Sequence, residues 1–270
     1  MLMNNKGLFG LFSKDVAVHV AATDMGKKYL HNEDAFFLPE ANPTWEVTNE
    51  KIEDSGRLYI LCDGMGGGKA GEVASSLATG WIARDFYAQP LDGRKPTERL
   101  AALACETNAK LHALAKNHDA YDGMGTTLVA AHIRENRLTL VSIGDSRAYL
   151  FRDGDLRQLT EDHTEIWPLY KNSSLTKEEL RTHPRSNVLS KALVVSEAIT
   201  ADDLFITTEP FREGDLFLLC SDGLTDMVPE EEIRGIMAKK KKMAWKADQL
   251  VAAANRNGGR DNITVVLVRA

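Results

Sequence analysis

The sequence lacks the features that mark a secreted, membrane-bound or nucleic-acid-binding protein. Its three cysteines, Cys62, Cys105 and Cys220, show no CxxC spacing, and we expect buried free thiols in a reducing compartment. There is no long apolar run, so we expect no membrane span. The net charge of −6 is unlike the basic excess of a nucleic-acid-binding protein, and we expect no nucleic-acid partner. The sequence therefore predicts a cytoplasmic protein whose partners are proteins or small ions.

The N-terminal region has only a short apolar block, GLFGLF at residues 7–12, which lies between Lys6 and Lys14. This block is too short for the apolar core of a signal peptide. We interpret residues 1–15 as an N-terminal extension, either a frayed or docked terminus or a weak interfacial anchor. Beyond it we see no domain boundary and no internal repeat, and an apolar fraction of 43% is ordinary for a globular chain.

The residues that are present favour antiparallel β structure covered by helices. Strand-like runs are joined by the tight turns Glu135-Asn136 and Asp153-Gly154, and successive hairpins build antiparallel rather than doubly wound parallel sheets. Residues 40–56 are polar and predict a loop. Residues 161–186, which two prolines interrupt, predict a mobile flap with only a short helical stretch, TKEEL at residues 176–180. Helical spacing of apolar residues predicts helices over residues 72–87, 96–116, 229–237 and 245–255.

Two apolar strands end in similar acidic sequences. LYILC at residues 58–62 leads into Asp63-Gly64, and LFLLC at residues 216–220 leads into Ser221 and Asp222. Such an acid is either part of a polar turn or a carboxylate delivered to a site, and the repetition favours a site. The acids that lie at the ends of strand-like runs are Glu33, Asp34, Asp63, Asp145, Asp222 and Asp261.

Carboxylates gathered in one pocket repel one another unless a cation lies between them. No histidine or cysteine stands at a compatible spacing, so the ligands are all oxygen, which favours Mg²⁺ or Mn²⁺ over Zn²⁺ or copper. The sequence contains no twelve-residue calcium loop. Two such ions would lower the pKa of a shared water and stabilise charge on a transferring phosphoryl group.

The chain resembles the metal-dependent (type 2C) Ser/Thr protein phosphatases in their bacterial form, from about residue 16 onward. The matching motifs, in chain order, are NEDA at 32–35, DGMGG at 63–67 with AGEVAS at 70–75, GTTL at 125–128, GDSRAYL at 144–150, LTEDHT at 159–164, SDGL at 221–224 and GRDNITVV at 259–266. The resemblance implies one phosphatase domain over residues 16–270 with a flap at about 164–186. It also implies an α+β fold, a four-layer α-β-β-α sandwich of two antiparallel sheets flanked by helices.

The resemblance further implies a binuclear Mg²⁺ or Mn²⁺ centre. Asp63 is similar to the bridging ligand, with the Gly64 carbonyl on one ion and with Asp222 and Asp261 on the other. Asp63, Asp222 and Asp261 are thereby the implied catalytic residues. By this analogy a metal-bound hydroxide attacks phosphorus in line, with no phosphoenzyme, and the chain contains no nucleophile motif such as GxSxG.

Three more acids complete the implied metal set. Glu33 and Asp34 resemble ligands or supporting groups on the Gly64 side, and Asp145 resembles the acid that, with Asp222, holds a third, weaker ion. The cofactors expected from the resemblance are therefore two Mg²⁺ or Mn²⁺ ions, with a place for a third.

As a function, the resemblance implies hydrolysis of phospho-Ser and phospho-Thr in protein substrates, in signalling opposite a cognate Ser/Thr kinase. We expect a monomer. An alternative is a regulatory pseudophosphatase or binding module that keeps the metal site with weak turnover. A further alternative is a phosphohydrolase of small metabolites, which would act equally well on phosphosugars and phosphopeptides.

The chain departs from the family where an arginine clamps the substrate phosphate. The family pattern DxGxxRxxNxD reads DMGKKYLHNED here, which puts Tyr29 in place of the arginine and removes a bidentate cationic fork. Lys28 or its neighbour Lys27, or Arg185 on the flap, could supply charge without the fork geometry. The predicted substrate-binding residues are therefore Tyr29, Lys28 and Arg185, and we expect weaker phosphate binding than in a standard member.

Other differences bear on substrate handling more than on metal binding. Gly68 stands where many bacterial members have histidine, and Lys191 and Val194 replace an arginine and a glycine. His163 is either a structural histidine or a general acid, and we favour the structural interpretation. Met65 stands where animal relatives have their suspected acid histidine, which leaves water to protonate the leaving group.

The lysine run at residues 239–242 is either a solvated helix end or an electrostatic docking patch. The first interpretation is favoured.

Overall fold

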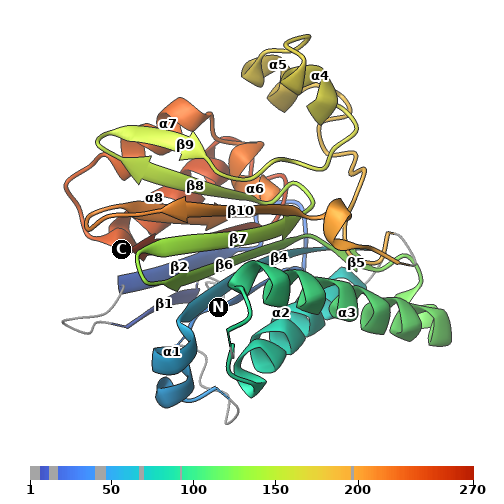
Figure 1. Ribbon diagram of the computed structural model, residues 1–270. Helices are drawn as coiled ribbons and strands as arrows, with labels where there is room; N and C mark the ends of the chain where they lie inside the picture. Colours follow the sequence, from blue (N-terminus) through green and yellow to red (C-terminus); the bar gives the residue numbers. More distant parts are fainter. Residues whose placement is uncertain (1–6, 12–17, 40–46, 67–69, 92, 196–197) are drawn as a thin grey trace, which may run out of the picture.

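The computed structural model describes residues 7–11, 18–39, 47–66, 70–91, 93–195 and 198–270. In this part of the chain two antiparallel sheets pack face to face, and helices cover their outer faces (Figure 1). The predicted four-layer α+β sandwich is confirmed.

The first sheet contains both chain ends of the described structure. Its strands, in spatial order, are β1 (Gly7–Leu11), β2 (Val18–Asp24), β12 (Ile263–Arg269), β11 (Leu216–Cys220), β8 (Arg147–Arg152) and β9 (Asp155–Gln158). Its outer face packs on the C-terminal helices α6 (Asp222–Thr225), α7 (Glu230–Met237) and α8 (Met243–Arg256). Residues 7–11, within the segment predicted as an extension, pair with β2 as an edge strand.

The second sheet is built around β4. Its strands, in spatial order, are β10 (Phe205–Pro210), β7 (Arg137–Ile143), β6 (Leu128–Arg134), β4 (Arg57–Met65) and β3 (Asp34–Phe37), and the short β5 (Gly125–Thr126) pairs with the end of β4. Its outer face packs on α2 (Ala70–Ala88) and α3 (Pro96–Asn117), with α1 (Asn49–Ser55) beside α2. Short 3-10 helices lie at Asp119–Tyr121 and Ala201–Asp203.

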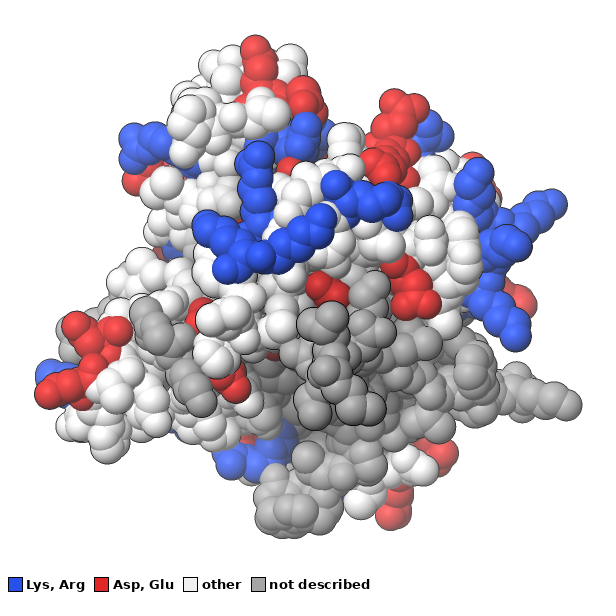
Figure 2. Space-filling model, turned by 180° about the vertical axis from the view of Figure 1, so that it is seen from behind, with Lys and Arg blue, Asp and Glu red and all other residues white. Residues whose placement is uncertain are grey.

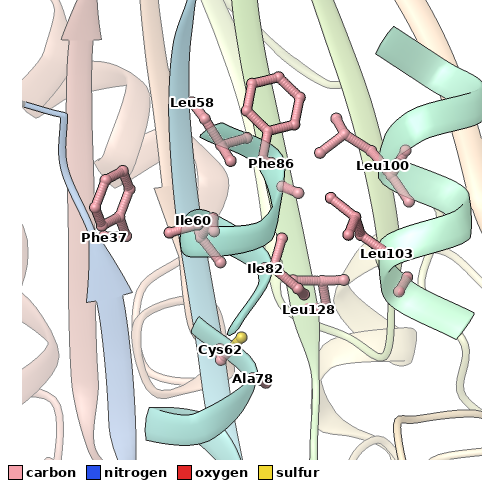
Figure 3. Close-up of a cluster of buried hydrophobic side chains, with 14 of the residues drawn as sticks. Phe37, Leu58, Ile60, Cys62, Ala78, Ile82, Phe86, Leu100, Leu103 and Leu128 are labelled. Carbon is pink, nitrogen blue, oxygen red and sulfur yellow. The ribbon is translucent and has the colours of Figure 1, made fainter. Parts of the chain in front are cut away.

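Burial on both faces explains why β4 is apolar at successive positions. Leu58, Ile60 and Cys62 are buried against α2 and α3, and Figure 3 shows these side chains among those of the two helices. Tyr59 and Leu61, which alternate with them, are buried between the two sheets. Because neither face meets water, the strand shows no polar alternation. The same holds for β11, where Leu218 faces the helices and Phe217 faces the other sheet.

Hairpin turns form where the sequence predicts them. Glu135 and Asn136, between β6 and β7, have positive φ angles of 51° and 58°, the backbone that a two-residue type I′ turn requires. Asp153 and Gly154 connect β8 to β9 in the same way, with φ of 54° and 86°. These predicted hairpins are confirmed.

The prediction of a loop over residues 40–56 is wrong in its second half, where α1 forms. Thr48 caps this helix by accepting a hydrogen bond from the backbone N–H of Lys51, and Ile52 is buried beneath it. The polar composition concealed a short helix that has one buried apolar position. Residues 40–46 of that prediction lie outside the described residues.

The segment predicted as a flap is more helical than expected. It contains α4 (Trp167–Lys171) as well as the predicted short helix, now α5 (Lys177–Thr182), which begins with a capping box between Thr176 and Glu179. Ile166, Trp167 and Leu180 form a small apolar cluster of their own. The flap therefore forms a lobe that projects from the sandwich (Figure 1).

Cys62 and Cys220 are buried and Cys105 is half-buried, and all three are free thiols, as predicted. Burial raises the pKa of the Cys62 thiol to about 12, so this thiol is not a nucleophile at neutral pH. No helix in the described part of the chain has the length and apolar character needed to span a membrane.

Candidate active site

The pairing of β3 with β4 brings Asp34 and Asp63 directly opposite each other. Side chains alternate along a strand, so Asp63 continues the inter-sheet series of Tyr59 and Leu61 and lies at the end of the apolar layer. Directly opposed residues on antiparallel strands place their side chains in contact, and like charges there are destabilising. Two carboxylates in this position therefore require a cation or a proton.

The first sheet supplies its acids at the same end of the sandwich. Asp222 follows β11 and Asp261 precedes β12, and these two strands are antiparallel neighbours. Two contacts connect them to the other sheet: the Ser221 hydroxyl donates to Asp34 Oδ2 at 2.9 Å, and the backbone N–H of Glu33 donates to Asn262 Oδ1 at 2.8 Å. The two similar strand ends noticed in the sequence are thus assembled into one site.

Five of the predicted acids line a cavity of about 660 Å³, which we call the acidic pocket, whereas Asp34 lies outside its lining. Its lining residues are Tyr29, Glu33, Asp63, Gly64, Met65, Gly66, Thr127, Asp145, Asn187, Val188, Leu189, Val195, Asp222, Asp261 and Asn262. Among the described residues no lysine, arginine or histidine lines it. The pocket therefore gathers negative charge that no side chain in its wall neutralises.

The electrostatic consequence is a set of raised carboxyl pKa values. Burial raises the pKa of Asp63 well above its usual range, and the neighbouring charges of Asp34 and Asp222 raise it further. Burial, with Asp162 and Asp226 nearby, raises the pKa of Asp145 to about 7, and burial raises that of Asp34 to about 6. Without a cation, this pocket would hold protons at neutral pH.

The donor atoms suit a hard divalent cation. Asp34 Oδ1 and Asp222 Oδ1 are buried and have no hydrogen-bond partner, although buried carboxylate oxygens ordinarily have one. No three His, Cys, Asp or Glu side chains of the described chain are already arranged around one point as ligands of a single ion. Mg²⁺ keeps several of its waters and needs only one or two carboxylates, so an all-oxygen wall of this kind fits Mg²⁺ or Mn²⁺.

Glycine at residues 64 and 71 lets α2 approach the end of β4. A Cβ on Gly64 would lie 2.2 Å from the carbonyl oxygen of Gly71, and a Cβ on Gly71 would lie 2.2 Å from Glu33 Oε2. The Gly64 N–H donates to the Glu33 carbonyl at 3.1 Å, and the Ser75 hydroxyl on α2 donates to the same oxygen at 2.5 Å. The glycines thus position the backbone that carries Glu33 and Gly64.

The predicted substrate-binding residues occupy different places. Tyr29 is 44% exposed and lines the acidic pocket, whereas Lys28, whose ammonium lies 5.2 Å from the centre of the Tyr29 ring, lines a neighbouring cleft. Arg185 lines neither cavity and forms an ion pair with Glu165 on the flap. Gly68 lies outside the described residues.

His163 lies outside the acidic pocket and connects the flap to the sheet. Its Nδ1 accepts a hydrogen bond from the Gly144 N–H at 3.1 Å, and its backbone carbonyl accepts one from Ser190. Burial lowers the pKa of His163, which keeps the ring neutral. These contacts support a structural role rather than that of a general acid.

Some residues of the site were not anticipated from the sequence. Asn187, from the segment that returns from the flap, donates through its amide to Asp226 and, at 3.4 Å, to Asp222. Asp226 lies one helical turn after Asp222, a spacing that could have drawn attention to it. Thr127 binds β4 through its hydroxyl, which accepts from the Asp63 N–H at 2.9 Å. Asn187 offered no local signal, because its place depends on how the flap folds back.

The fold and site define a class of protein: a β-sandwich hydrolase whose polar end is a carboxylate pocket suited to divalent cations. The chain matches the family model described as Protein phosphatase 2C over residues 28–263. It is 38% identical over 249 residues to the serine/threonine phosphatase Stp of Listeria monocytogenes, a match that covers 91% of this chain and 93% of that protein.

Two solved phosphatase structures superpose on most of this chain. The structure of the Mycobacterium tuberculosis serine/threonine phosphatase PstP/Ppp superposes with a TM-score of 0.78 at 36% identity, over 93% of this chain and 97% of that one. The catalytic domain of the protein phosphatase PstP in complex with two manganese ions gives a TM-score of 0.77 at 34% identity, over 97% and 99% of the two chains.

The chain belongs to the protein phosphatase 2C family. The predicted family is confirmed, and with it the prediction of an enzyme, a metal-dependent protein phosphatase.

Proposed function

We propose that this protein hydrolyses phosphoserine and phosphothreonine in protein substrates at the acidic pocket. The observation that carries the proposal is the gathering of Asp63, Asp222 and Asp261 in a pocket wall that has no basic side chain among the described residues. Asp34, directly opposite Asp63 on the neighbouring strand, adds a further carboxylate beside this wall. Such a wall repels a phosphate unless divalent cations reverse its charge. The pocket can therefore bind a phosphate only when metal is bound.

In this proposal two Mg²⁺ or Mn²⁺ ions are held by Asp63, the Gly64 carbonyl, Asp222 and Asp261, with Glu33 and Asp34 on the Gly64 side. Asp145, with Asp222, provides the place for a third, weaker ion. The ions, when bound, neutralise phosphate charge and lower the pKa of a water. The Mn²⁺-containing relative supports the number and kind of ion.

Hydrolysis adds a water oxygen to phosphorus and breaks the bond from phosphorus to the serine or threonine oxygen. The attacking water loses one proton and the leaving oxygen gains one. In the described lining no histidine reaches the pocket, and Met65 stands beside Gly64, so we assign the leaving oxygen's proton to solvent. Ser221 and Asn262 serve to hold the acid-bearing segments of the two sheets together rather than to move protons. No side chain forms a covalent intermediate.

The expected setting is cytoplasmic signalling. We propose that the protein acts as a monomer on the targets of a cognate Ser/Thr kinase and reverses their phosphorylation. The phosphatase names of its relatives support the substrate class.

One observation favours a second candidate, a binding module with weak turnover. Tyr29, at the position where the family has its phosphate-clamping arginine, supplies no cation to the rim of the pocket. Such a module would bind phosphoproteins and metal without releasing phosphate at a useful rate.

Turnover separates the two candidates. The purified chain is incubated with p-nitrophenyl phosphate and with a phosphothreonine peptide, each in Mn²⁺, in Mg²⁺ and in chelator. The phosphatase proposal expects release that needs metal and that Asp222→Asn reduces at least about a hundredfold. Absence of release under every metal condition would instead establish the binding module. Equal rates on phosphosugars and phosphopeptides would point to a metabolite phosphohydrolase.

A further inference from the structure

A second cavity of about 630 Å³ opens beside the acidic pocket, under the flap lobe, and we call it the basic cleft. Its lining includes Arg181 near the end of α5, His183 and Asn187 from the segment that follows α5, and Lys28 and Arg260 from two other loops. Figure 2 shows the corresponding gathering of Lys and Arg side chains below the lobe at the upper left of that view. The net charge of the chain is −6, so the charge of this part of the surface is opposite in sign to that of the whole chain.

The basic cleft and the acidic pocket adjoin each other. Asn187, Val188 and Asp261 line both of them. A peptide whose phosphate lies among the pocket acids can therefore place neighbouring residues in the cleft without leaving the protein surface. The cleft volume is within the range of about 300–1,000 Å³ that is usual for ligand sites.

Two of the cations in the cleft form no ion pair with a described residue. Lys28 and Arg260 are exposed, and in the described part of the chain no Asp or Glu forms an ion pair with either, although the charge of Lys28 acts on Asp261 from a greater distance. Arg181 is held in place by its ion pair with Glu178 and by donating a 2.9 Å hydrogen bond to the Asp226 carbonyl. The lining carries these cations and His183 together with two acids.

Those two acids are already engaged on the side of the acidic pocket. Asp226 accepts the amide of Asn187, and Asp261 accepts the N–H of Asn262 at 2.8 Å. With Asp261 assigned to metal in the proposed function, the remaining charge of the cleft is positive. An anionic group of a ligand is what this charge would bind.

Backbone contacts join the two loops that carry Lys28 and Arg260. The Lys27 N–H donates to the Gly259 carbonyl at 2.7 Å, which joins the loop after β2 to the loop before β12. Gly26, at a φ of 72°, packs so closely that a Cβ would lie 2.2 Å from the Asp261 carbonyl oxygen. Two loops more than two hundred residues apart in the sequence are therefore held together, and each supplies one cation to the lining of the cleft, an arrangement suited to an anion.

We propose that the basic cleft is a second phosphate subsite, which holds one phosphate of a multiply phosphorylated peptide while another is hydrolysed in the acidic pocket. This inference rests on the proposed function, because it assigns the cleft to a part of the same substrate. A concave site that shares part of its lining with the acidic pocket and contains acids of its own fits a peptide better than a membrane surface. Lys28 and Arg260 then determine specificity rather than catalysis.

The test compares two phosphothreonine peptides of one sequence. One carries in addition a non-hydrolysable phosphonate analogue of phosphothreonine, placed one, two or three residues before or after the reacting residue. With Mn²⁺ bound, we expect kcat/KM at the best spacing to be about tenfold higher for the peptide with the second anion. The quantity compared between proteins is the ratio of kcat/KM for the peptide with the second anion to kcat/KM for the peptide without it. In Arg260→Gln and in Lys28→Gln this ratio should fall toward one. An effect of the substitution on catalysis itself changes both values equally and cancels in the ratio.

Matched controls remove a charge elsewhere. Arg256→Gln and Lys241→Gln replace exposed cations that do not line the cleft, and both should keep the wild-type ratio. A ratio near one at every spacing, with turnover of p-nitrophenyl phosphate intact, overturns the subsite and leaves the proposed function standing. Arg260-dependent binding to phosphatidylserine vesicles with a ratio of one also overturns it and assigns the cleft to lipid. Absence of all turnover would remove the proposed function as well.

Discussion

Tyr29 lies on the rim of the acidic pocket with 44% of its surface exposed, where its hydroxyl can offer one weak hydrogen bond and no positive charge. Tyr29→Arg restores a planar guanidinium with paired donors at this position. We expect KM for a phosphothreonine peptide to fall about fivefold to thirtyfold, because one charged hydrogen bond contributes about 1–2 kcal/mol. Steady-state kinetics in saturating Mn²⁺ measure this KM in wild type and in Tyr29→Arg. Tyr29→Lys is the control for charge without the fork, and an unchanged KM in Tyr29→Arg would contradict the role assigned to this position.

Val194 shows backbone strain next to the pocket. Its φ is 75°, a left-handed value that a β-branched residue rarely adopts, and the family pattern has glycine here. The Val194 N–H donates to Asn108 Oδ1 at 2.7 Å, which helps to hold the strained backbone in place.

Val194→Gly should therefore raise the free energy of unfolding by about 1 kcal/mol, since the relief of strain exceeds the added chain entropy of glycine. Urea denaturation measures this change. Val195→Gly, at the next residue, whose φ is not in the left-handed region, is the matched control and should destabilise. Destabilisation of similar size in both variants would show that the backbone at Val194 is not strained.

At the level of elements, the contact between α2 and the end of β4 positions the backbone that carries Glu33 and Gly64. Two glycines of α2 offer a matched comparison: a Cβ on Gly71 would collide with Glu33 and Gly64, while Gly80 has nothing within 4 Å. Gly80→Ala should stabilise the protein by about 0.5–1 kcal/mol through helix propensity.

Gly71→Ala, by contrast, should destabilise it by about 1–3 kcal/mol and weaken Mn²⁺ activation, because the helix must move away from Glu33. Thermal denaturation and a Mn²⁺ titration of activity measure the two effects. If both substitutions had the same effect, close packing at Gly71 would not be the reason for its glycine.

Elements that depend on local chemistry could be predicted from the sequence. The turn pairs at Glu135-Asn136 and Asp153-Gly154 predicted their hairpins, and the long periodic helices were predicted to within a few residues. α1 was missed because a single buried isoleucine gives no period to detect. Pro229, predicted as the first helical residue of α7, is instead its N-cap.

Arrangements that depend on distant pairing could not be predicted from local pattern. Nothing near Asp34 indicates that it lies opposite Asp63, since that register follows from the pairing of β3 with β4. The acids were recognised as a set because each lies at the end of a strand-like run, and the resemblance to a family then assigned their roles. Asn187 and the basic cleft, in contrast, depend on how the flap returns to the sandwich.

For the molecule as a whole, two buried histidines predict loss of stability in acid. Burial lowers the pKa of His19 and of His132 to about 4, and His132 is held neutral with Nε2–H donating to the Ser55 carbonyl at 2.7 Å. Because these folded-state pKa values lie below the unfolded value of about 6.5, the unfolded chain takes up protons first as the pH falls. The free energy of unfolding should drop by up to about 3 kcal/mol per histidine between pH 6.5 and 4.

Urea denaturation of wild type and His132→Gln at pH 7 and pH 4.5 tests this expectation. The difference between the two proteins cancels the titration of the pocket acids, whose raised pKa values act in the opposite direction. The pH-dependent loss should be smaller in the variant by about 2 kcal/mol. Equal losses would show that His132 is not buried in its neutral form.

The central claim is that the acids brought together from the two sheets form one metal-dependent phosphatase site. Its most direct test is phosphate release from a phosphothreonine peptide by chelator-treated protein as Mn²⁺ is added, in wild type and in Asp63→Asn. We predict no release without metal, a saturable increase with Mn²⁺ in wild type, and a loss of at least about a hundredfold in the variant. Release that is independent of metal, or that is the same in Asp63→Asn, would contradict the account.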